Sequence, residues 1–400
     1  MSRVIPIAVA GTAADATSGL PAPPPLSLYV HVPWCVRKCP YCDFNSHEAK
    51  GSIPEEAYGA ALIADLESAL PQVWNRPVYS IFFGGGTPSL LSVRTIDALL
   101  SAFRARLPLA ADAEITLEAN PGTVEAAKFA GFRAAGVNRV SLGIQSFDDA
   151  KLAALGRIHS ADEARRAIDL ASAHFEQVNI DLMYALPQQT LHEAQRDLAT
   201  AVSFGTPHLS AYHLTLEPNT PYARLPPPLP DDDLAAAMQD MVEETLAAAG
   251  YEHYETSAYA RPGHRCAHNL NYWTFGDYLG IGAGAHGKIG SAFGIVREMR
   301  RKHPRDYLDG AVRGDFVQER HEIAAADLPF EFMMNALRLC DGFPARLYAE
   351  RTGLSLAGIR EPLQAARHEG LLTTDAERIA PTARGRRFLN ALLRMFLPDA

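Results

Sequence analysis

Between residues 28 and 214 the chain alternates short apolar runs with longer amphipathic segments. The short runs are rich in β-branched and aromatic residues and predict six strands, at Leu28–Val32, Val78–Phe83, Glu114–Glu118, Arg139–Ile144, Val178–Met183 and His208–Leu214. The segments between them, at 55–70, 92–106, 123–135, 160–173 and 190–203, are long enough for the helical crossovers that parallel strands require. A closed eight-strand barrel needs two more such units. The pattern therefore predicts an α/β fold built on an open, partial (β/α)6 barrel.

Other segments flank this repeat and divide the chain into four regions. Residues 1–26 are rich in Ala, Thr and Pro and offer little to bury, which predicts a disordered tail. The barrel domain is expected to cover residues 27–250, including a helix near 234–249, and residues 251–324 are expected to extend it. Helical runs at 327–339, 345–351, 355–368 and 383–396 predict a mainly helical, winged-helix-like domain over residues 325–400.

Charge and hydropathy exclude several classes of partner. The 400 residues carry a formal net charge of −9, so the chain lacks the broad basic surface that nucleic-acid binding needs. No run of about 18 uncharged apolar residues predicts a transmembrane helix, and the N-terminus does not resemble a signal peptide. We therefore expect a cytoplasmic protein that does not bind nucleic acid. Peripheral contact with a membrane is left open.

Three of the five cysteines, Cys35, Cys39 and Cys42, lie within eight residues directly after the first predicted strand. This spacing favours metal ligation in a reducing compartment over disulfides. Thiolates are the usual ligands of iron–sulfur clusters, and three of them leave one iron of a four-iron cubane open for chemistry. The alternative is a structural zinc site completed by Cys266 or His47.

Polar and glycine residues follow several of the predicted strands. Gly84–Pro88 comes directly after the second strand, where glycines let the backbone approach a ligand closely. Glu118, Gln145 and Asp181 lie at or just after the ends of the third, fourth and fifth strands. One such residue alone is more typical of a helix cap or a surface group. Because barrel active sites form at the carboxyl ends of the strands, three of them together indicate a single cavity.

From about Leu28 to the C-terminus the chain resembles the radical SAM family. The resemblance is carried by Cys-x3-Cys-x2-Cys with Tyr41 before the last cysteine and by the stretches FGGGTPS, SLGIQSF, DLMYALP and LTLEPNTP. It implies that the three cysteines bind a [4Fe–4S] cluster, and that S-adenosylmethionine chelates the open iron and is cleaved to a radical. It also implies cofactor contacts at Tyr29, Tyr41, Gly85, Gly86, Thr87, Glu118, Gln145, Arg157 and Asp181. The guanidinium of Arg157 suits a bidentate pair with a carboxylate, although a plain surface cation is the alternative.

Phe44 separates two branches of this family. The porphyrinogen-oxidising branch carries a fourth cysteine two residues after the third, where this chain has Phe44. Phenylalanine can neither ligate a metal nor ionise as a thiol does. The resemblance therefore argues against oxygen-independent coproporphyrinogen III dehydrogenase activity, which remains the alternative function, and no catalytic residue is assigned.

The segment Arg265–Trp273 contains His-Asn-x-x-Tyr, a pattern typical of the heme chaperone branch of the family. The resemblance implies a protein that binds heme as cargo and passes it to heme-accepting proteins. Because a neutral imidazole is a standard axial ligand of heme iron, His268 is the predicted ligand. Cys266 is a competing thiolate ligand. A third hypothesis is a regulatory protein that acts through its C-terminal domain, with a vestigial cofactor site.

Overall fold

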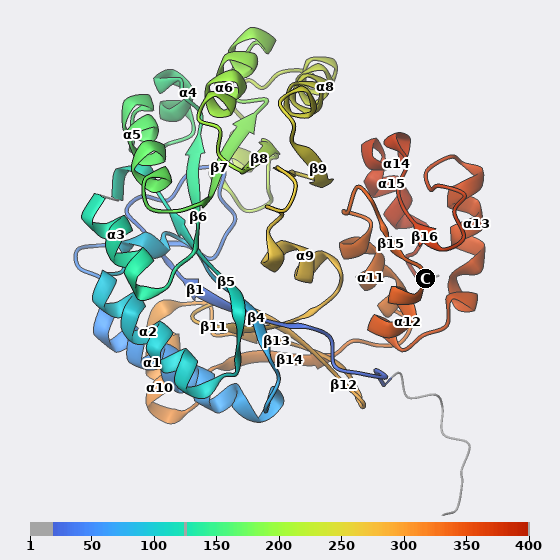
Figure 1. Ribbon diagram of the computed structural model, residues 1–400, viewed down its shortest axis with the longest axis horizontal. Helices are drawn as coiled ribbons and strands as arrows, with labels where there is room; N and C mark the ends of the chain where they lie inside the picture. The colour runs from blue at the N-terminus through green and yellow to red at the C-terminus, as the bar shows by residue number, and fades with distance from the viewer. Residues whose placement is uncertain (1–18, 124–125, 399–400) are drawn as a thin grey trace, which may run out of the picture.

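The computed structural model describes residues 19–123 and 126–398 and is organised around one 12-stranded sheet. Its central strands are β1 (Leu26–Val32), β4 (Val78–Gly85), β5 (Leu109–Ala119), β6 (Arg139–Gln145), β7 (Gln177–Tyr184) and β8 (His208–His213). They are neighbours in this order, and each pair is parallel (Figure 1). These are the six strands predicted from the sequence, so the prediction of a partial barrel is confirmed.

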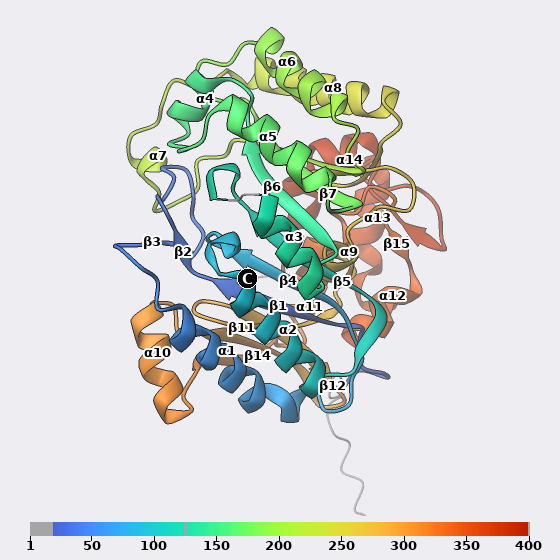
Figure 2. The same ribbon diagram turned by 60° about the vertical axis from the view of Figure 1, so that its left-hand side comes forward.

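Helices cover the outer face of these strands (Figures 1 and 2). They are α1 (Glu55–Ala69), α2 (Val93–Arg106), α3 (Ala126–Ala135), α5 (Ala161–Ser172), α6 (Leu191–Ser203) and α8 (Asp232–Ala248). The short helices α4 (Asp149–Ala154) and α7 (Pro221–Arg224) lie together at the cysteine-loop end, where the Tyr222 N–H donates to the Pro40 carbonyl at 3.1 Å. Capping boxes start two of the covering helices: Ser160 with Glu163 in α5, and Thr190 with Glu193 in α6. Apolar residues on the inward helix faces and the outward strand faces form one large core.

The predicted extension, residues 251–324, adds strands to both edges of the barrel. Beyond β8 lie β10 (Ala258–Ala260) and β9 (Glu252–Glu255), and beyond β1 lie β11 (Asp277–Ile281), β12 (His286–Ser291), β13 (Gly294–Arg300) and β14 (Val317–Glu322). The chain passes from one edge to the other through α9 (Ala267–Trp273), which contacts β1, β4 and β11. The last helix of this region is α10 (Pro304–Arg313). The segment therefore joins the two edges of the open barrel.

The C-terminal domain is mainly helical, as predicted. It contains α11 (Leu328–Ala336), α12 (Arg346–Thr352), α13 (Arg360–His368), α14 (Ala383–Arg387), α15 (Leu389–Arg394) and the short strands β15 (Phe343–Pro344) and β16 (Arg378–Ile379). The single helix predicted at 383–396 is two helices, because Phe388 leaves helical geometry with φ −109° and ψ 37°. No helix in the described part of the chain is long and apolar enough to span a membrane.

Part of the predicted tail packs against the rest of the protein. Residues 1–18 lie outside the described residues, but Leu20 is only 6% exposed and joins the core of the C-terminal domain. Its N–H donates to the Ser291 carbonyl at 3.0 Å. A Cβ on Gly290 would lie 2.3 Å from the Leu20 side chain, so that glycine makes room for it. The segment predicted as a disordered tail, 1–26, therefore extends too far. Besides Leu20, the Pro24 carbonyl accepts from Arg76 Nη2 at 2.6 Å and the Pro25 carbonyl accepts from the Asp277 N–H at 2.9 Å.

Candidate functional site

The three clustered cysteines lie on the loop that follows β1, at the carboxyl end of the barrel strands. Cys35 ends the short strand β2 (Trp34–Cys35), which pairs with β3 (His47–Glu48), and Cys39 and Cys42 follow. All three thiols are free and partly exposed. Burial raises the pKa of Cys35, and the neighbouring Cys42 and Cys39 raise it further. The three thiols are therefore close enough for their charges to interact.

Each thiol has at least one polar neighbour. Thr87 Oγ1 donates to Cys35 Sγ at 3.5 Å, and Arg157 Nη1 donates to Cys39 Sγ at 3.7 Å. Cys42 Sγ lies 3.8 Å from a serine hydroxyl. Three unpaired thiolates are a soft ligand set that suits an iron–sulfur cluster or zinc.

The two donors that the sequence offers for a zinc site have other neighbours. The buried thiol of Cys266 donates to Glu114 Oε1 at 3.2 Å, on the amino-terminal half of β5. The ring of His47 faces that of His303, with 5.3 Å between the ring centroids. Within the described residues no group of three or more His, Cys, Asp or Glu side chains could hold one metal ion. Cys266, one of the two donors that the sequence offers for a zinc site, is therefore turned toward Glu114 and away from the cysteine loop.

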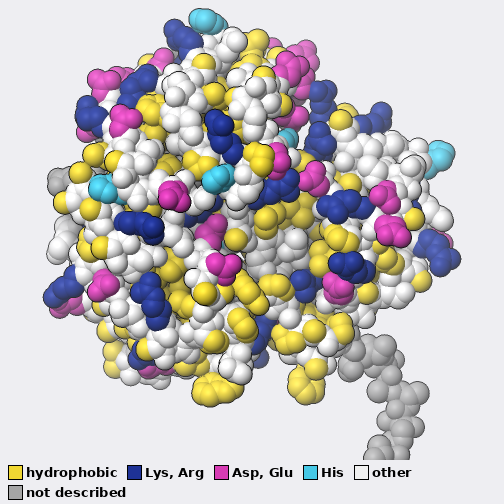
Figure 3. All heavy atoms as spheres, in the orientation of Figure 1, with side chains coloured by type: hydrophobic (Ala, Val, Ile, Leu, Met, Phe, Trp, Pro, Cys, Tyr) yellow, Lys and Arg dark blue, Asp and Glu magenta, His cyan; other side chains and the backbone are white. Residues whose placement is uncertain are grey.

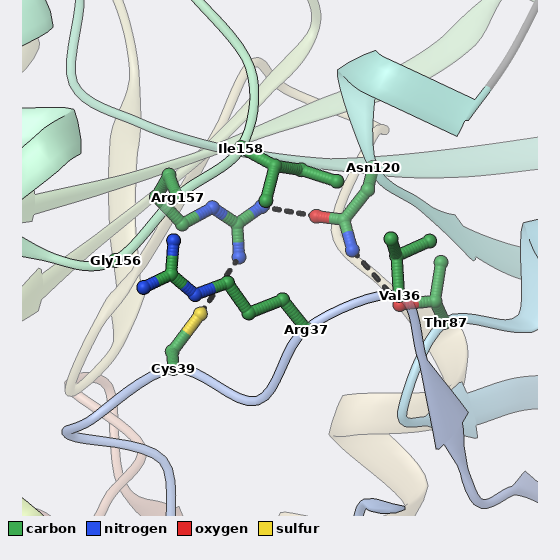
Figure 4. A pocket seen from close by; sticks show the side chains of 8 residues that line it. All are labelled: Val36, Arg37, Cys39, Thr87, Asn120, Gly156, Arg157 and Ile158. Carbon is green, nitrogen blue, oxygen red and sulfur yellow. Dashed lines mark hydrogen bonds between the residues drawn. The ribbon is translucent and has the colours of Figure 1, made fainter. Parts of the chain in front are cut away.

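A pocket opens beside Cys39 (Figure 4) and is lined by Val36, Arg37, Cys39, Thr87, Asn120, Gly156, Arg157 and Ile158. Four of these residues form one chain of hydrogen bonds. The Arg157 guanidinium bonds Cys39 and the Asn120 side chain, and Asn120 Nδ2 donates to Thr87 Oγ1 at 2.9 Å. Sequence reasoning missed Asn120, although its place directly after β5, next to Glu118, is the signal that marked the other residues.

The glycines after β4 are required by close packing. Gly85 has φ +111°, and a Cβ there would lie 2.5 Å from the His31 ring. A Cβ on Gly86 would lie 2.5 Å from the Trp34 carbonyl oxygen. The Gly85 N–H donates to Glu118 Oε2 at 3.1 Å. The loop therefore brings bare backbone against the cysteine loop, as the sequence predicts.

The carboxyl groups of Glu118 and Asp181 lie close enough inside the barrel for their charges to interact. Burial raises the pKa of Glu118 to about 8, and the negative charge of Asp181 raises it as well. Burial also raises the pKa of Asp181 to about 6, although Ser141 Oγ and Asn179 Nδ2 donate to it at 3.0 and 2.8 Å. These hydrogen bonds fix the Asp181 carboxyl, and the pair is able to hold or release a proton near neutral pH.

The other predicted cofactor residues lie around this interior. Tyr29 is on β1, and its hydroxyl is 3.1 Å from His31 Nδ1. Gln145 ends β6 with φ +70°. Its amide and the Arg157 guanidinium both lie against Gly143, each within about 3.3 Å of the position that a Cβ on this glycine would take. Tyr41 packs against the apolar cluster that contains Leu155, Met183, Leu186 and Leu214. The predicted residues thus extend from the cysteine loop into the barrel interior, where Tyr29 also lies near His268.

His268 lies at the opposite end of the barrel, on α9. It is 8% exposed, and burial lowers its pKa to about 4, so the imidazole is neutral at pH 7. Its ring centroid is 4.9 Å from that of Phe82 and 6.4 Å from that of Tyr29. The ring therefore packs near aromatic side chains of β4 and β1, on the side of the barrel interior away from the cysteine loop.

Cys266, the competing ligand, is a poor source of thiolate. It is 3% exposed, and burial and the charge of Glu114 raise its pKa. The same carboxylate accepts hydrogen bonds from the backbone N–H groups of Ala267 and His268, each at 3.0 Å. Glu114 therefore anchors the first turn of α9 and keeps the Cys266 sulfur turned toward itself.

Comparison with known proteins identifies relatives of the whole chain. Residues 29–201 match the radical SAM superfamily, and residues 323–388 match the HemN C-terminal domain. The chain is 51% identical to the heme chaperone HemW of Escherichia coli K12, over 94% of this chain and 99% of that protein. It is 47% identical to heme chaperone HemW of Haemophilus influenzae, over 95% and 100%. Among solved structures, coproporphyrinogen III oxidase HemN from Escherichia coli, a radical SAM enzyme, matches with a TM-score of 0.80 and 24% identity, over 94% and 90% of the two chains.

Proposed function

Because this chain belongs to the radical SAM superfamily, and within it to the group of the heme chaperone HemW, we propose that it binds heme and passes it to heme-dependent proteins. In this proposal one protein holds three groups: a [4Fe–4S] cluster, S-adenosylmethionine and heme. The first two control binding or release of the third. The observation that carries the proposal is the neutral, buried imidazole of His268, which faces aromatic rings inside the barrel.

The cysteine loop would hold the cluster through Cys35, Cys39 and Cys42. Hydrogen bonds to cluster sulfurs influence the reduction potential, and the Thr87 and Arg157 side chains donate to two of these cysteines. The cluster, when bound, supplies one-electron reduction of S-adenosylmethionine. The pocket beside Cys39 lies next to the cysteine loop and would be part of the cofactor site.

The polar residues behind the loop would bind S-adenosylmethionine. Arg157 carries the positive charge that suits the carboxylate of its methionine part, and Glu118 and Asp181 are acceptors for its hydroxyl and amino groups. The glycines bare backbone groups for close approach. The remaining proposed contacts are Tyr29, Tyr41, Gly85, Gly86, Thr87 and Gln145.

The floor of the barrel would bind heme. A neutral imidazole can bind heme iron through its unprotonated nitrogen without first losing a proton. Aromatic side chains pack well against a flat porphyrin. Figure 3 shows the surface hollowed between the barrel and the C-terminal domain, where α9 lies in Figure 1. This hollow offers an approach to the α9 segment from outside the barrel.

Anaerobic titration of the reconstituted full-length protein with hemin tests the proposal. The wild-type chain should give an imidazole-type heme spectrum and release the heme to an added heme-free acceptor. His268→Ala should weaken the binding and shift the spectrum. Residual binding is expected, because burial of the porphyrin persists after one iron bond is lost. The matched control is Cys266→Ala, two residues away, which should keep the wild-type spectrum.

Incubation with coproporphyrinogen III provides the opposing test. Phe44 is 63% exposed and stands where the oxidising branch carries a cysteine, so no thiol is available at this position. We expect no decarboxylation. Conversion at enzymatic rates, or an unchanged heme spectrum in His268→Ala together with a changed one in Cys266→Ala, would contradict the chaperone assignment or its ligand.

A further inference from the structure

The imidazole of His268 is held from one side by a short chain of hydrogen bonds. Ser80 Oγ, on β4, lies 3.0 Å from His268 Nδ1. Ser80 Oγ donates to Ser27 Oγ at 2.7 Å, and Ser27 Oγ also accepts from Asn271 Nδ2 at 2.9 Å. The two serines are each 1% exposed, so water does not compete for these bonds.

The direction of the serine bond determines the protonation of the imidazole. A hydroxyl has one hydrogen, and Ser80 gives its hydrogen to Ser27. While this bond to Ser27 is made, Ser80 Oγ has only lone pairs to offer His268 Nδ1, and a proton on that ring nitrogen then completes the 3.0 Å contact. In a neutral imidazole the proton on Nδ1 leaves Nε2 with its lone pair. Within the described part of the chain Nε2 makes no hydrogen bond, and the ring faces Phe82 and Tyr29.

We propose that Ser80 is a positioning residue that fixes His268 in the Nδ1–H tautomer and presents Nε2 to the barrel interior as a ready metal ligand, with Ser27 orienting the Ser80 hydroxyl. This inference rests on the proposed function, because the ligand it prepares is the proposed axial ligand of heme. Glu114 and Ser80 then act on different parts of the same residue: Glu114 holds the backbone of α9, and Ser80 holds the ring.

The Ser80 hydroxyl, which accepts the Nδ1–H bond, carries no charge, and this affects how strongly His268 would bind iron. A carboxylate bonded to Nδ1–H makes a histidine ligand more basic and strengthens its bond to the metal. A serine hydroxyl orients the ring with much less transfer of charge. The geometry therefore favours a ligand that is oriented but only moderately strong, which suits a cargo that must leave.

Nitrogen NMR of the heme-free protein, with 15N-labelled histidine, tests the tautomer directly. The expected result is one protonated nitrogen on His268, at Nδ1. In Ser27→Ala the Ser80 hydroxyl is free to donate to the ring, so the population of the Nε2–H tautomer should rise. A wild-type His268 protonated at Nε2 would overturn the proposal, whatever the protein does with heme.

Hemin titration of the variants tests the consequence for binding. Ser80→Ala should weaken heme binding about tenfold while keeping an imidazole-type spectrum, since loss of an outer partner of a histidine ligand costs on this order. The matched control is Thr116→Val on the adjacent strand β5. It removes a hydroxyl that is equally buried and has no partner among the described residues, and should bind heme as wild type does.

The outcomes separate this inference from the function on which it rests. Equal loss of affinity in Ser80→Ala and Thr116→Val would mean that any buried hydroxyl at the floor matters, and would overturn the positioning role. Unchanged affinity in Ser80→Ala with a weakened His268→Ala would do the same while leaving the chaperone function intact. If His268→Ala has no effect on heme, the axial ligand assignment fails, and the NMR result still decides the tautomer.

Discussion

The two ends of the barrel interior have opposite characters. At the carboxyl ends of the strands, partly exposed thiols stand beside the Arg157 guanidinium, at a pocket that opens to solvent. At the floor, the ring of His268 is buried, neutral and held by serine hydroxyls. Between them lie the two carboxyl groups of Glu118 and Asp181, whose pKa values are raised. One end is built for charged groups that arrive from solvent, and the other for a neutral metal ligand.

This contrast indicates a division of labour within one cavity. Charged ligands such as thiolates and the ends of S-adenosylmethionine need countercharges and access, which the upper end supplies. A histidine that ligates heme iron needs to be neutral and ordered, and burial at the floor provides both. Substitutions at each end are therefore expected to act first on the ligand that this end binds.

The largest effect should come from the cysteine loop. Cys39→Ser should remove the cluster, lowering iron and sulfide from about four each per chain to near zero, because a cubane needs each of its three protein ligands. The measurement is iron and sulfide analysis after anaerobic reconstitution. Cys340→Ser is the control, since Cys340 lies beyond the end of α11, outside the pocket, and should leave the iron content unchanged. Bound zinc in place of iron would refute the cluster.

A smaller effect should follow changes at the middle of the barrel. Asp181→Ala and Gln145→Ala should each weaken S-adenosylmethionine binding by about 1–3 kcal/mol, roughly fivefold to a hundredfold, because each removes one or two hydrogen bonds. Cluster content and the heme spectrum should stay as in wild type. Anaerobic calorimetric titration measures the loss, with Asp169→Ala on the exposed side of α5 as control. Wild-type affinity in both variants would place the cofactor elsewhere.

The raised pKa of Glu118 predicts a pH dependence of stability. The folded-state pKa of about 8 lies above the ordinary value of 4.5, so the folded protein holds this proton more tightly than the unfolded chain. The contribution of Glu118 to stability is therefore complete below about pH 4.5 and is lost as the pH rises through about 8. Denaturant unfolding of cluster-free protein should show stability falling over this range, and Glu118→Gln should reduce the fall. Parallel pH profiles for the two proteins would show that Glu118 ionises freely.

The smallest effect is expected at Cys266. Replacing it with alanine removes one hydrogen bond to Glu114 and a small buried side chain, so the free energy of unfolding should fall by about 1–2 kcal/mol. The heme spectrum should not change, because the buried thiol is protonated and turned away from the ring. A shifted heme spectrum in Cys266→Ala, with His268 unchanged, would show that the Cys266 sulfur is the axial ligand. The floor would then hold a thiolate ligand, as the other end does.

The sequence predicted strands and helices well where their patterns involve residues close together in the chain. The six barrel strands could be predicted because each is a short apolar run, and Glu118 lies at the end of β5 as expected. Asp181 was expected at a strand end, but it lies inside β7, three residues before Tyr184. The path of α9 across the open barrel and its contact with Ser80 could not be predicted. Ser80 and His268 are 188 residues apart, and a buried serine in a strand carries no signal of its own. The burial of Leu20 could not be predicted either, because the proline-rich segment around it is typical of a disordered tail.

The pairing of β1 has a consequence for how the chain is made. β1 hydrogen-bonds β4 on one side and β11 on the other, so Leu26 must find both Val78 and Asp277. A ribosome adds about 5–20 residues per second, so the β11 side of β1 waits on the order of 10–50 seconds for its partner. During that time an apolar strand presents unpaired backbone groups, the arrangement that most readily recruits other chains. A growing chain of this protein is therefore most exposed to aggregation at its first strand, until residue 281 has left the exit tunnel.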